Sequence, residues 1–282
     1  MSRATRLSRV SPLPLLFLIM GHCLAATPAV PRPAHVLLVI EENRAFGEII
    51  GSADAPYINE LAKQGALFTR SYAIGHPSEP NYVALFSGDP QGVQDDSCPH
   101  RYDKPNLASA LLQHRLGFAI YSENLPSEGF EDCASSDKLY RRKHNPIPDF
   151  SDVPATANKP FSAFPAEYSK LPTVAFVVPN MMNDMHDGTV QQADAWLKSR
   201  LAGYIRWAES NQSLLILTWD EDDGTDDNRV ATLVLGAGVK PGRYDERITH
   251  YDVLRTLADM YGVPAPGSAA TAHAITDIWT VP

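Results

Sequence analysis

A serine at the predicted start of a helix is the first residue in this sequence that could act as a nucleophile. Pro80 fits the first turn of a helix but not its interior, and Ser is favoured just ahead of a first turn, so a helix is predicted to begin at about Ser78. The positive end of a helix favours an anion, either a bound phosphate or the alkoxide of Ser78 itself. Taken alone, the segment is explained more simply by a Ser78 that only caps the helix.

Polar side chains come directly after three predicted strands, and their types suit a divalent cation. The clusters are Glu41-Glu42-Asn43, Asn183-Asp184-Met185-His186-Asp187 and Asp220-Glu221. Parallel strands end at the same edge of a sheet, where α/β proteins bind ligands, so the clusters are expected to lie together. The candidate ligand groups belong to Glu42, Asn43, Asp220, Glu221 and His186. Each cluster alone is also explained as a solvated turn, since exposed Asp and Glu are common.

A metal ion beside Ser78 would serve phosphate ester chemistry, because it would lower the pKa of the hydroxyl and neutralise the oxygens of a phosphate. Other site motifs do not fit the sequence. The acidic run that begins at Asp220 has Gly in fifth place and Ala231 in twelfth, so it is not an EF-hand loop. A Walker-type phosphate loop is missing, and so is the Gly-x-Ser-x-Gly elbow of ordinary α/β-hydrolase esterases.

Alternating strands and helices are expected to position these groups. Strands are predicted at 35–40, 66–72, 118–121, 173–178, 213–218 and 230–235, and helices at 57–63, from 78, and at 106–114, 190–210 and 250–261. The unbroken apolar run up to Ile40 is typical of a central parallel strand that is buried on both faces. The alternation predicts an α/β fold with a mainly parallel sheet flanked by helices.

Residues 124–171 interrupt this alternation. The segment is rich in Pro, Ser, Asp and aromatic residues, and its apolar residues follow neither a helical nor a strand period. A stretch this long without regular elements usually has a functional reason in a compact domain. We interpret it as a cap or long loop region over the site.

The first 25 residues are typical of a secretory signal peptide. Three arginines precede the apolar run 13–20, and small residues follow at Cys23, Ala25 and Ala26. The run is too short to span a membrane, and a retained membrane anchor is the alternative interpretation. Cleavage would make the protein secreted or periplasmic, and the loss of three arginines would move the formal charge from -9 to -12. So acidic a chain is a poor candidate for non-specific binding to nucleic acid or anionic lipid.

Two cysteines remain beyond the leader, Cys98 and Cys133. In an oxidising compartment they are best explained as one disulfide, which would close a loop of about 35 positions and stabilise the fold by roughly 3 to 4 kcal/mol. Two unrelated buried thiols are the alternative. The composition, 44% hydrophobic and 20% charged, is that of a globular chain and suffices for one large domain.

Five segments, in this order, resemble the bacterial phosphoesterase family of secreted acid phosphatases and phospholipases C. They are Glu42-Asn43-Arg44-Ala45-Phe46, Pro77-Ser78-Glu79-Pro80-Asn81-Tyr82, Arg142-Lys143-His144-Asn145-Pro146, Asn183-Asp184-Met185-His186-Asp187 and Trp219-Asp220-Glu221. The resemblance covers about residues 35–264 and looks closest to the compact acid phosphatases, some of which act on phosphoinositides. It implies an alkaline-phosphatase-like fold, with one phosphoesterase domain over residues 34–282 and residues 124–171 as an insert.

The resemblance also implies a role for each matching residue. The metal would be held by Glu42, Asn43, Ser78, Asp220 and Glu221, with Ser78 as the nucleophile. The phosphoryl group or the leaving oxygen would be contacted by His144 and His186, with Asp187 nearby. Tyr82 stands where phospholipase members often have Arg, so the phospholipase contacts do not carry over directly, and a sulfatase is disfavoured. For His76 and His250 a structural role and a role in the site both stay open.

These residues predict a secreted, metal-dependent acid phosphatase that hydrolyses phosphate monoesters through a phosphoseryl intermediate. A protonated His144 or His186 would donate to the leaving group, which predicts a mildly acidic optimum. The expected substrate is a small phosphate monoester or a phosphoinositide, with no nucleic acid partner and no integral membrane association. Two alternatives stay open, a phospholipase C that cleaves phospholipid diesters and a non-catalytic metal-bound binding protein. The sequence does not identify the divalent metal ion.

Overall fold

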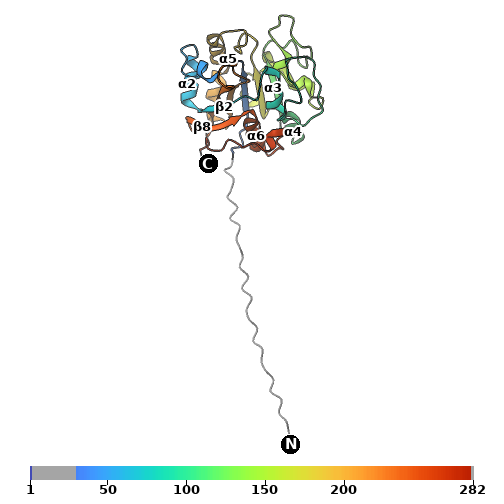
Figure 1. Cartoon of the computed structure of the whole chain (residues 1–282), viewed down its shortest axis with the longest axis vertical. Helices are drawn as coiled ribbons and strands as arrows, with labels where there is room; N and C mark the ends of the chain where they lie inside the picture. The colour runs from blue at the N-terminus through green and yellow to red at the C-terminus, as the bar shows by residue number, and fades with distance from the viewer. Residues whose placement is uncertain (2–29, 281–282) are drawn as a thin grey trace.

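The computed structural model describes Met1 and residues 30–280, and these residues fold around one eight-stranded sheet (Figure 1). Residues 2–25 of the expected leader, Cys23 among them, lie outside the described residues. The strands are β1 (Val36–Glu41), β2 (Ala66–Tyr72), β3 (Phe118–Ser122), β4 (Asn158–Pro160), β5 (Val174–Val178), β6 (Leu214–Trp219), β7 (Arg229–Gly236) and β8 (Gly242–Thr249). Their order in the sheet is β4-β3-β5-β1-β6-β7-β2-β8.

The sheet is mixed but mostly parallel. β1 pairs in parallel with both β5 and β6, with Val36 opposite Val174 on one side and Leu214 on the other. β3 is parallel to β4 and β5, and β2 is parallel to β8. Within the described sheet, β7 alone runs antiparallel to its neighbours, β6 and β2. The carboxyl ends of all the other strands therefore lie at one edge, as the alternation of elements predicts.

Helices cover both faces of this sheet (Figure 1). They are α1 (Phe46–Ile49), α2 (Pro56–Gln64), α3 (Ser78–Ser87), α4 (Leu107–Gln113), α5 (Val190–Ser210) and α6 (His250–Tyr261). α3, α4 and α6 share one hydrophobic cluster, while α1, α2 and α5 share the other. The result is the three-layer α/β arrangement predicted from the sequence.

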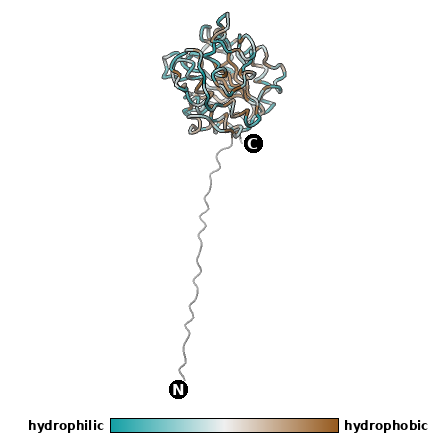
Figure 2. The backbone as a smooth tube through the Cα atoms, turned by 90° about the vertical axis from the view of Figure 1, so that its right-hand side faces the viewer, coloured by the Kyte–Doolittle hydropathy of each residue, from teal (hydrophilic) through white to brown (hydrophobic). Residues whose placement is uncertain are grey.

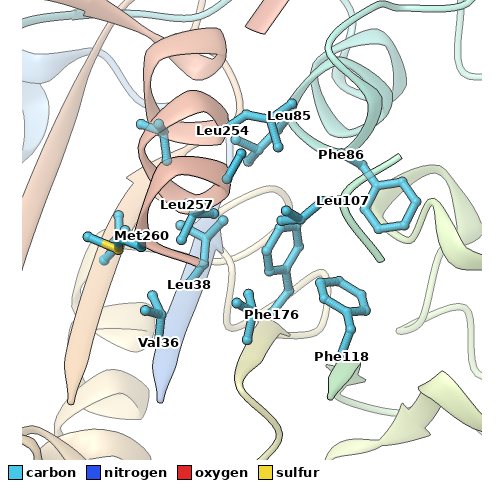
Figure 3. Packing of buried hydrophobic residues seen from close by; sticks show 14 of the residues in the cluster. Val36, Leu38, Leu85, Phe86, Leu107, Phe118, Phe176, Leu254, Leu257 and Met260 are labelled. Carbon is cyan, nitrogen blue, oxygen red and sulfur yellow. The ribbon is translucent and has the colours of Figure 1, made fainter. Parts of the chain in front are cut away.

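The central strand β1 feeds both layers of the core because successive side chains of a strand point to opposite faces. Val36 and Leu38 belong to the cluster of α3, α4 and α6, and Figure 3 shows Leu257 of α6 beside Leu38. Leu37 and Val39 belong to the opposite cluster. The tube view in Figure 2 shows the hydrophobic segments gathered in the interior. β1 is buried along its whole length. The packing of this strand therefore fixes the backbone position of Glu42 and Asn43, which follow it.

Residues 124–171 contain short elements only. They are the 3-10 helices η1 (Arg142–His144), η2 (Ile147–Asp149), η3 (Ala155–Ala157), η4 (Phe161–Ala163) and η5 (Tyr168–Lys170), together with β4. Cys133 in this segment forms a disulfide with Cys98, which confirms that prediction. Among the described residues, no helix combines the length and the hydropathy that crossing a bilayer requires.

Candidate active site

The loops after β1, β2, β5 and β6 bring the candidate site residues together. Glu42 follows β1 directly, and its backbone N–H donates to the carbonyl of Asp184 in the loop after β5, at 2.8 Å. Asn43 adopts a left-handed conformation with φ of 49°, and its N–H donates to Asp220 Oδ1 at 3.2 Å. The N–H of Asp220 in turn donates to the carbonyl of Glu41. Backbone hydrogen bonds thus connect the three polar clusters predicted from the sequence.

Ser78 lies at the start of α3, but its side chain does not cap the helix. The N-cap residue is Pro77, and no side-chain hydrogen bond caps this end, so the expectation that Ser78 serves as the N-cap is wrong. Its hydroxyl instead lies 3.1 Å from Glu42 Oε2 and 3.3 Å from Glu221 Oε1. Ser78 is buried, and its hydroxyl joins carboxylates that lie 36 and 143 positions away in the chain.

Asn81, one turn into α3, fixes the loop that delivers Ser78. Its side-chain oxygen accepts hydrogen bonds from the backbone N–H groups of Ile74 and Gly75. Its amide group donates to the carbonyl oxygens of Gly75 and Pro77. These four hydrogen bonds hold the turn between β2 and α3, and so fix the backbone from which the Ser78 side chain extends.

Two of the predicted metal ligands have a buried side-chain oxygen without a hydrogen-bond donor in the part of the chain that the structure describes. These oxygens are Asn43 Oδ1 and Asp220 Oδ2. Buried oxygens without a donor are costly, and a cation supplies the missing interaction. Together with the oxygens of Glu42, Ser78 and Glu221 they form an oxygen-rich donor set that fits a hard divalent cation. The predicted metal ligands are thus brought together, and their donor set fits the expected ion.

The carboxyl groups of the cluster hold their protons unusually strongly. Burial, followed by the charge of Glu221, raises the pKa of Asp220 to about 8. Burial also raises the pKa of Glu221 to about 7, although the hydrogen bond from Ser78 opposes this. For Glu42 burial and the charges of Asp220 and Asp184 raise the pKa well above its ordinary range. The ionised carboxylates would be stabilised at this site by a bound cation, which would also keep their charge from repelling a phosphate.

His144 lies beneath this cluster rather than at its open side. Its Nε2 is 3.2 Å from Glu42 Oε1 and its Nδ1 is 3.5 Å from Asp184 Oδ2, and its ring stacks on Tyr82 at 5.1 Å between centroids. Burial, and then the charges of Lys143 and His186, lower its pKa well below the ordinary value. This shift favours the neutral imidazole, which can contact a ligand or a cation. The role of His144 as a proton donor stays a prediction.

His186 lies on the more open side of the site, between two charged neighbours. Its Nδ1 is 2.7 Å from Asp187 Oδ1, and its Nε2 is 3.2 Å from the ammonium of Lys143. Burial lowers its pKa, and the hydrogen bond with Asp187 opposes this. The ligand atoms of Glu42, His144 and His186 also lie within 4.8 Å of one another, close enough to share a metal ion. His186 is thus placed to reach either a cation or a phosphoryl group.

Lys143 and Asp96 are site residues that the sequence reasoning missed. The Lys143 ammonium donates to Asp96 Oδ2 at 2.7 Å, while Asp96 Oδ1 accepts the N–H of Glu79, the residue after Ser78. Burial lowers the pKa of Lys143, but Asp96 and Glu42 more than offset this, so the net shift is upward and the ammonium stays charged. Lys143 could have been found from its position next to His144, in one of the five segments that resemble the family. Asp96 lies in a loop without a motif.

The two histidines with open roles both contact residues of the cluster. His76 Nδ1 lies 2.7 Å from Glu221 Oε2, and its Nε2 lies 3.3 Å from Asp222 Oδ1, while almost half of the side chain is exposed. His250 is buried, and its Nε2 lies 2.7 Å from the backbone carbonyl of Asp220. Both histidines therefore contact the loop after β6 directly.

A cavity of about 310 Å³ opens next to this cluster. It is lined by Asp96, Cys98, Cys133, Arg141, Lys143, Met181 and His186. The residues of the long segment 124–171 thus form much of its wall, and the disulfide lies in that wall. Lys143 and His186 line the cavity and also lie beside the carboxylate cluster, so the cavity and the cluster adjoin each other.

The layered sheet and the order of its strands define an α/β fold of the alkaline-phosphatase-like class. A protein of the alkaline phosphatase superfamily from Vibrio parahaemolyticus matches 90% of this chain and 72% of its own, with a TM-score of 0.65 and 13% identity. A phosphonate monoester hydrolase from Silicibacter pomeroyi matches 86% of this chain and 75% of its own, with a TM-score of 0.59 and 14% identity. Likeness at this level of identity shows the fold.

The sequence profile of the Phosphoesterase family matches residues 52–264, and the chain belongs to this family. It is 49% identical over 257 residues to a phosphatidylinositol-3-phosphatase from Mycobacterium tuberculosis, covering 90% of this chain and 85% of that one. It is 33% identical over 227 residues to an acid phosphatase from Aspergillus fumigatus, of which it spans 51%. The chain is therefore a phosphoric ester hydrolase with relatives named as phosphatases.

Proposed function

We propose that the protein is a metal-dependent phosphomonoesterase of the acid phosphatase type, with Ser78 as its nucleophile. The observation that carries this proposal is the position of the Ser78 hydroxyl, 3.1 Å from Glu42 Oε2 and 3.3 Å from Glu221 Oε1 at the start of α3. A carboxylate beside the hydroxyl can accept its proton, and the helix N-terminus together with a bound cation would stabilise the alkoxide that attacks phosphorus. A serine that only capped its helix would donate or accept within that helix.

The metal would be held by the oxygens of Glu42, Asn43, Ser78, Asp220 and Glu221. When bound, a divalent cation lowers the pKa of a coordinated hydroxyl and neutralises charge on phosphoryl oxygens. The unpartnered Asn43 Oδ1 and Asp220 Oδ2 support this assignment. Lys143 would add a fixed positive charge on the side of the cavity, where Asp96 holds its ammonium.

In the proposed reaction, the Ser78 hydroxyl passes its proton to Glu42 or Glu221, its two hydrogen-bond acceptors, as a bond forms from Oγ to phosphorus and the bond from phosphorus to the leaving oxygen breaks. The same carboxylate returns this proton to Oγ when the phosphoserine is hydrolysed. His186 would donate the proton that the leaving oxygen needs, because Asp187 holds its Nδ1 at 2.7 Å and supports the charged imidazole. Its Nε2 lies 3.2 Å from the Lys143 ammonium and would give up that contact when it is protonated. A water molecule then attacks the phosphoserine, gives a proton back to His186, and releases phosphate with Ser78 restored. The lowered pKa of His186 restricts its charged form to acidic pH, so activity should fall as pH rises.

Three observations bear on substrate and location. One relative is named as a phosphatidylinositol-3-phosphatase and others as acid phosphatases, so a phosphoinositide and a small monoester are the proposed substrate classes. The composition of residues 1–25 and the Cys98–Cys133 disulfide support export to the periplasm or the medium. The alternative, a phospholipase C, would cleave a phospholipid diester instead of a monoester, and an assay with both substrates distinguishes the two activities.

The test is phosphate release from p-nitrophenyl phosphate and phosphocholine release from phosphatidylcholine micelles, with and without chelation. We expect release from the monoester only, lost on chelation and restored by a divalent ion. Ser78→Ala should lower turnover by at least about 10³-fold, whereas the control Ser87→Ala at the end of the same helix should not. A phosphate adduct on the Ser78 peptide of acid-quenched enzyme would identify the intermediate. Near-wild-type turnover by Ser78→Ala would exclude this nucleophile.

A further inference from the structure

Arg141, which lines the cavity, and Arg142, the next residue, differ sharply in their contacts. Arg142 is buried and fully engaged, since it donates to Asp149 Oδ1 through Nε and Nη2 at 2.9 and 2.7 Å. It also donates to the backbone carbonyls of Glu131, His100 and Pro148. Arg141, one position earlier, lines the cavity, and its Nε is buried without a partner. Within the described residues Arg141 makes no ion pair.

The backbone of Arg141 is nevertheless held in place. Arg141 pairs with Ala134 in an isolated antiparallel bridge, and its carbonyl accepts the N–H of His144. The N–H of Arg142 donates to the carbonyl of Cys133, whose side chain is tied to Cys98. A guanidinium on so fixed a backbone is positioned before any ligand arrives, which lowers the cost of binding.

The other charged groups around this cavity are already paired. Lys143 contacts Asp96 at 2.7 Å and His186 at 3.2 Å, so its charge is directed to the reaction side of the cavity. Asp96 lines the same cavity and is engaged with Lys143 and with the N–H of Glu79. Among the described residues that line this cavity, Arg141 is therefore the cation whose buried Nε has no hydrogen-bond acceptor. It is also near enough for its charge to lower the pKa of His144.

We propose that Arg141 is a specificity-determining residue that binds a second phosphate group on the leaving group of the substrate. This inference rests on the proposed function and deepens it. A planar guanidinium fits the oxygens of a phosphate with two parallel hydrogen bonds. A cavity of about 310 Å³ is at the small end of ligand sites, which suits a compact phosphorylated ring. The preferred substrate class is then a small polyol that carries the cleaved monoester and one further phosphate or phosphodiester.

The experiment compares three substrates that differ in this second group. Inositol 3-phosphate has no second phosphate, inositol 1,3-bisphosphate has a free one, and dioctanoyl phosphatidylinositol 3-phosphate has a diester to a lipid. We would measure kcat and KM for the wild type, Arg141→Gln and Arg141→Lys. Arg101→Gln is the matched control, because Arg101 is an exposed arginine of the neighbouring loop that does not line this cavity.

We expect Arg141→Gln to lower kcat/KM by roughly 10- to 100-fold for the two substrates with a second phosphate, mainly through KM. For inositol 3-phosphate the loss should stay below about threefold, as for the Arg101→Gln control on every substrate. Arg141→Lys should show an intermediate loss, because an ammonium keeps the positive charge but cannot donate two parallel hydrogen bonds as a guanidinium does. A loss on the lipid analogue alone, or on the soluble bisphosphate alone, supports the proposal and identifies the source of the group.

Equal losses on all three substrates would overturn the proposal, since they would mean a general role for Arg141 in the site. Unchanged selectivity would overturn it as well. These outcomes differ from failure of the proposed function, which would show as absence of phosphate release by the wild type from p-nitrophenyl phosphate and from inositol 3-phosphate. That last result would overturn both proposals.

Discussion

Tyr82 donates a hydrogen bond of 2.5 Å to Glu42 Oε1, while the other oxygen of the same carboxylate faces Ser78. The two hydroxyls come from residues four positions apart on α3, so they lie on the same face of the helix. Glu42 is thus oriented by one turn of α3 and presents its Oε2 to the proposed nucleophile. His144, stacked on Tyr82, contacts the oxygen that Tyr82 already holds.

Tyr82→Phe should weaken the proposed metal site without removing any proposed ligand. The change leaves Glu42 Oε1 without its donor, and the loss of such an outer contact typically costs 10- to 100-fold in metal affinity. We expect activity of the chelated enzyme to return only at about that much higher concentration of divalent ion. The concentration series on wild type and variant measures this directly, and Tyr57→Phe on the remote helix α2 is the control. Identical titration curves would contradict the role of Tyr82.

Asp187→Asn should shift the pH dependence of catalysis toward acid. The hydrogen bond with Asp187 raises the pKa of His186 against the effect of burial, so its removal lowers that pKa further. If charged His186 is the acid, the alkaline limb of kcat/KM against pH should move down by about one unit. A profile that keeps its alkaline limb and only loses amplitude would show that His186 does not act as the acid.

His250 should make the fold sensitive to acid. Burial lowers its pKa from 6.5 to about 4, so its neutral form stabilises the native state. This contribution is complete above the unfolded pKa of about 6.5 and is lost as pH falls through about 4. The full effect is about 3 kcal/mol in the free energy of unfolding.

His250→Gln keeps a donor near the Nε2 position but does not titrate. Denaturant unfolding of both proteins at pH 7 and pH 4.5 should therefore show a smaller loss of stability in the variant at the lower pH. An equal loss in the two proteins would assign the acid sensitivity to other groups. The measurement uses unfolding alone, so it does not depend on the reaction.

Removal of the disulfide should destabilise the protein and loosen the cavity wall. Cys98 and Cys133 are 35 positions apart, and a loop of this size corresponds to about 3 to 4 kcal/mol. We expect Cys98→Ser/Cys133→Ser to unfold at lower denaturant concentration, by an amount that reductant reproduces in the wild type. Reductant should leave the double variant unchanged. A wild type that resists reductant at full stability would contradict this contribution.

Much of the layered architecture could be predicted from hydrophobic patterns. The apolar runs of β1, β5 and β6 are buried on both faces, and the helix at 190–210 was predicted at its observed bounds. β8 was missed because its residues Gly242–Thr249 are mostly polar and exposed at the sheet edge, where burial leaves no pattern in the sequence. The very short β4 and α1 give no period to detect.

The candidate site could be predicted in its residues but not in its contacts. Strand ends indicated which carboxylates would meet, because parallel strands end at one edge. The burial of His144 and the absence of a helix cap by the Ser78 side chain depend on how α3 and η1 pack. The spacing of residues in the sequence does not predict this packing. Asp96 and Arg141 matter through a cavity wall formed by two loops and a disulfide, which exists only in the folded chain.

The candidate metal site also depends on the order of the strands. Its oxygens come from residues as far apart in the chain as Glu42 and Glu221, and β1 must lie between β5 and β6 before they can meet. Contacts of such sequence separation form slowly, because long loops must close first. A partly folded chain therefore has no complete set of oxygens with which to retain an ion. Metal binding would then act on the completed sheet, so that retention of the ion reports that the whole sheet has assembled.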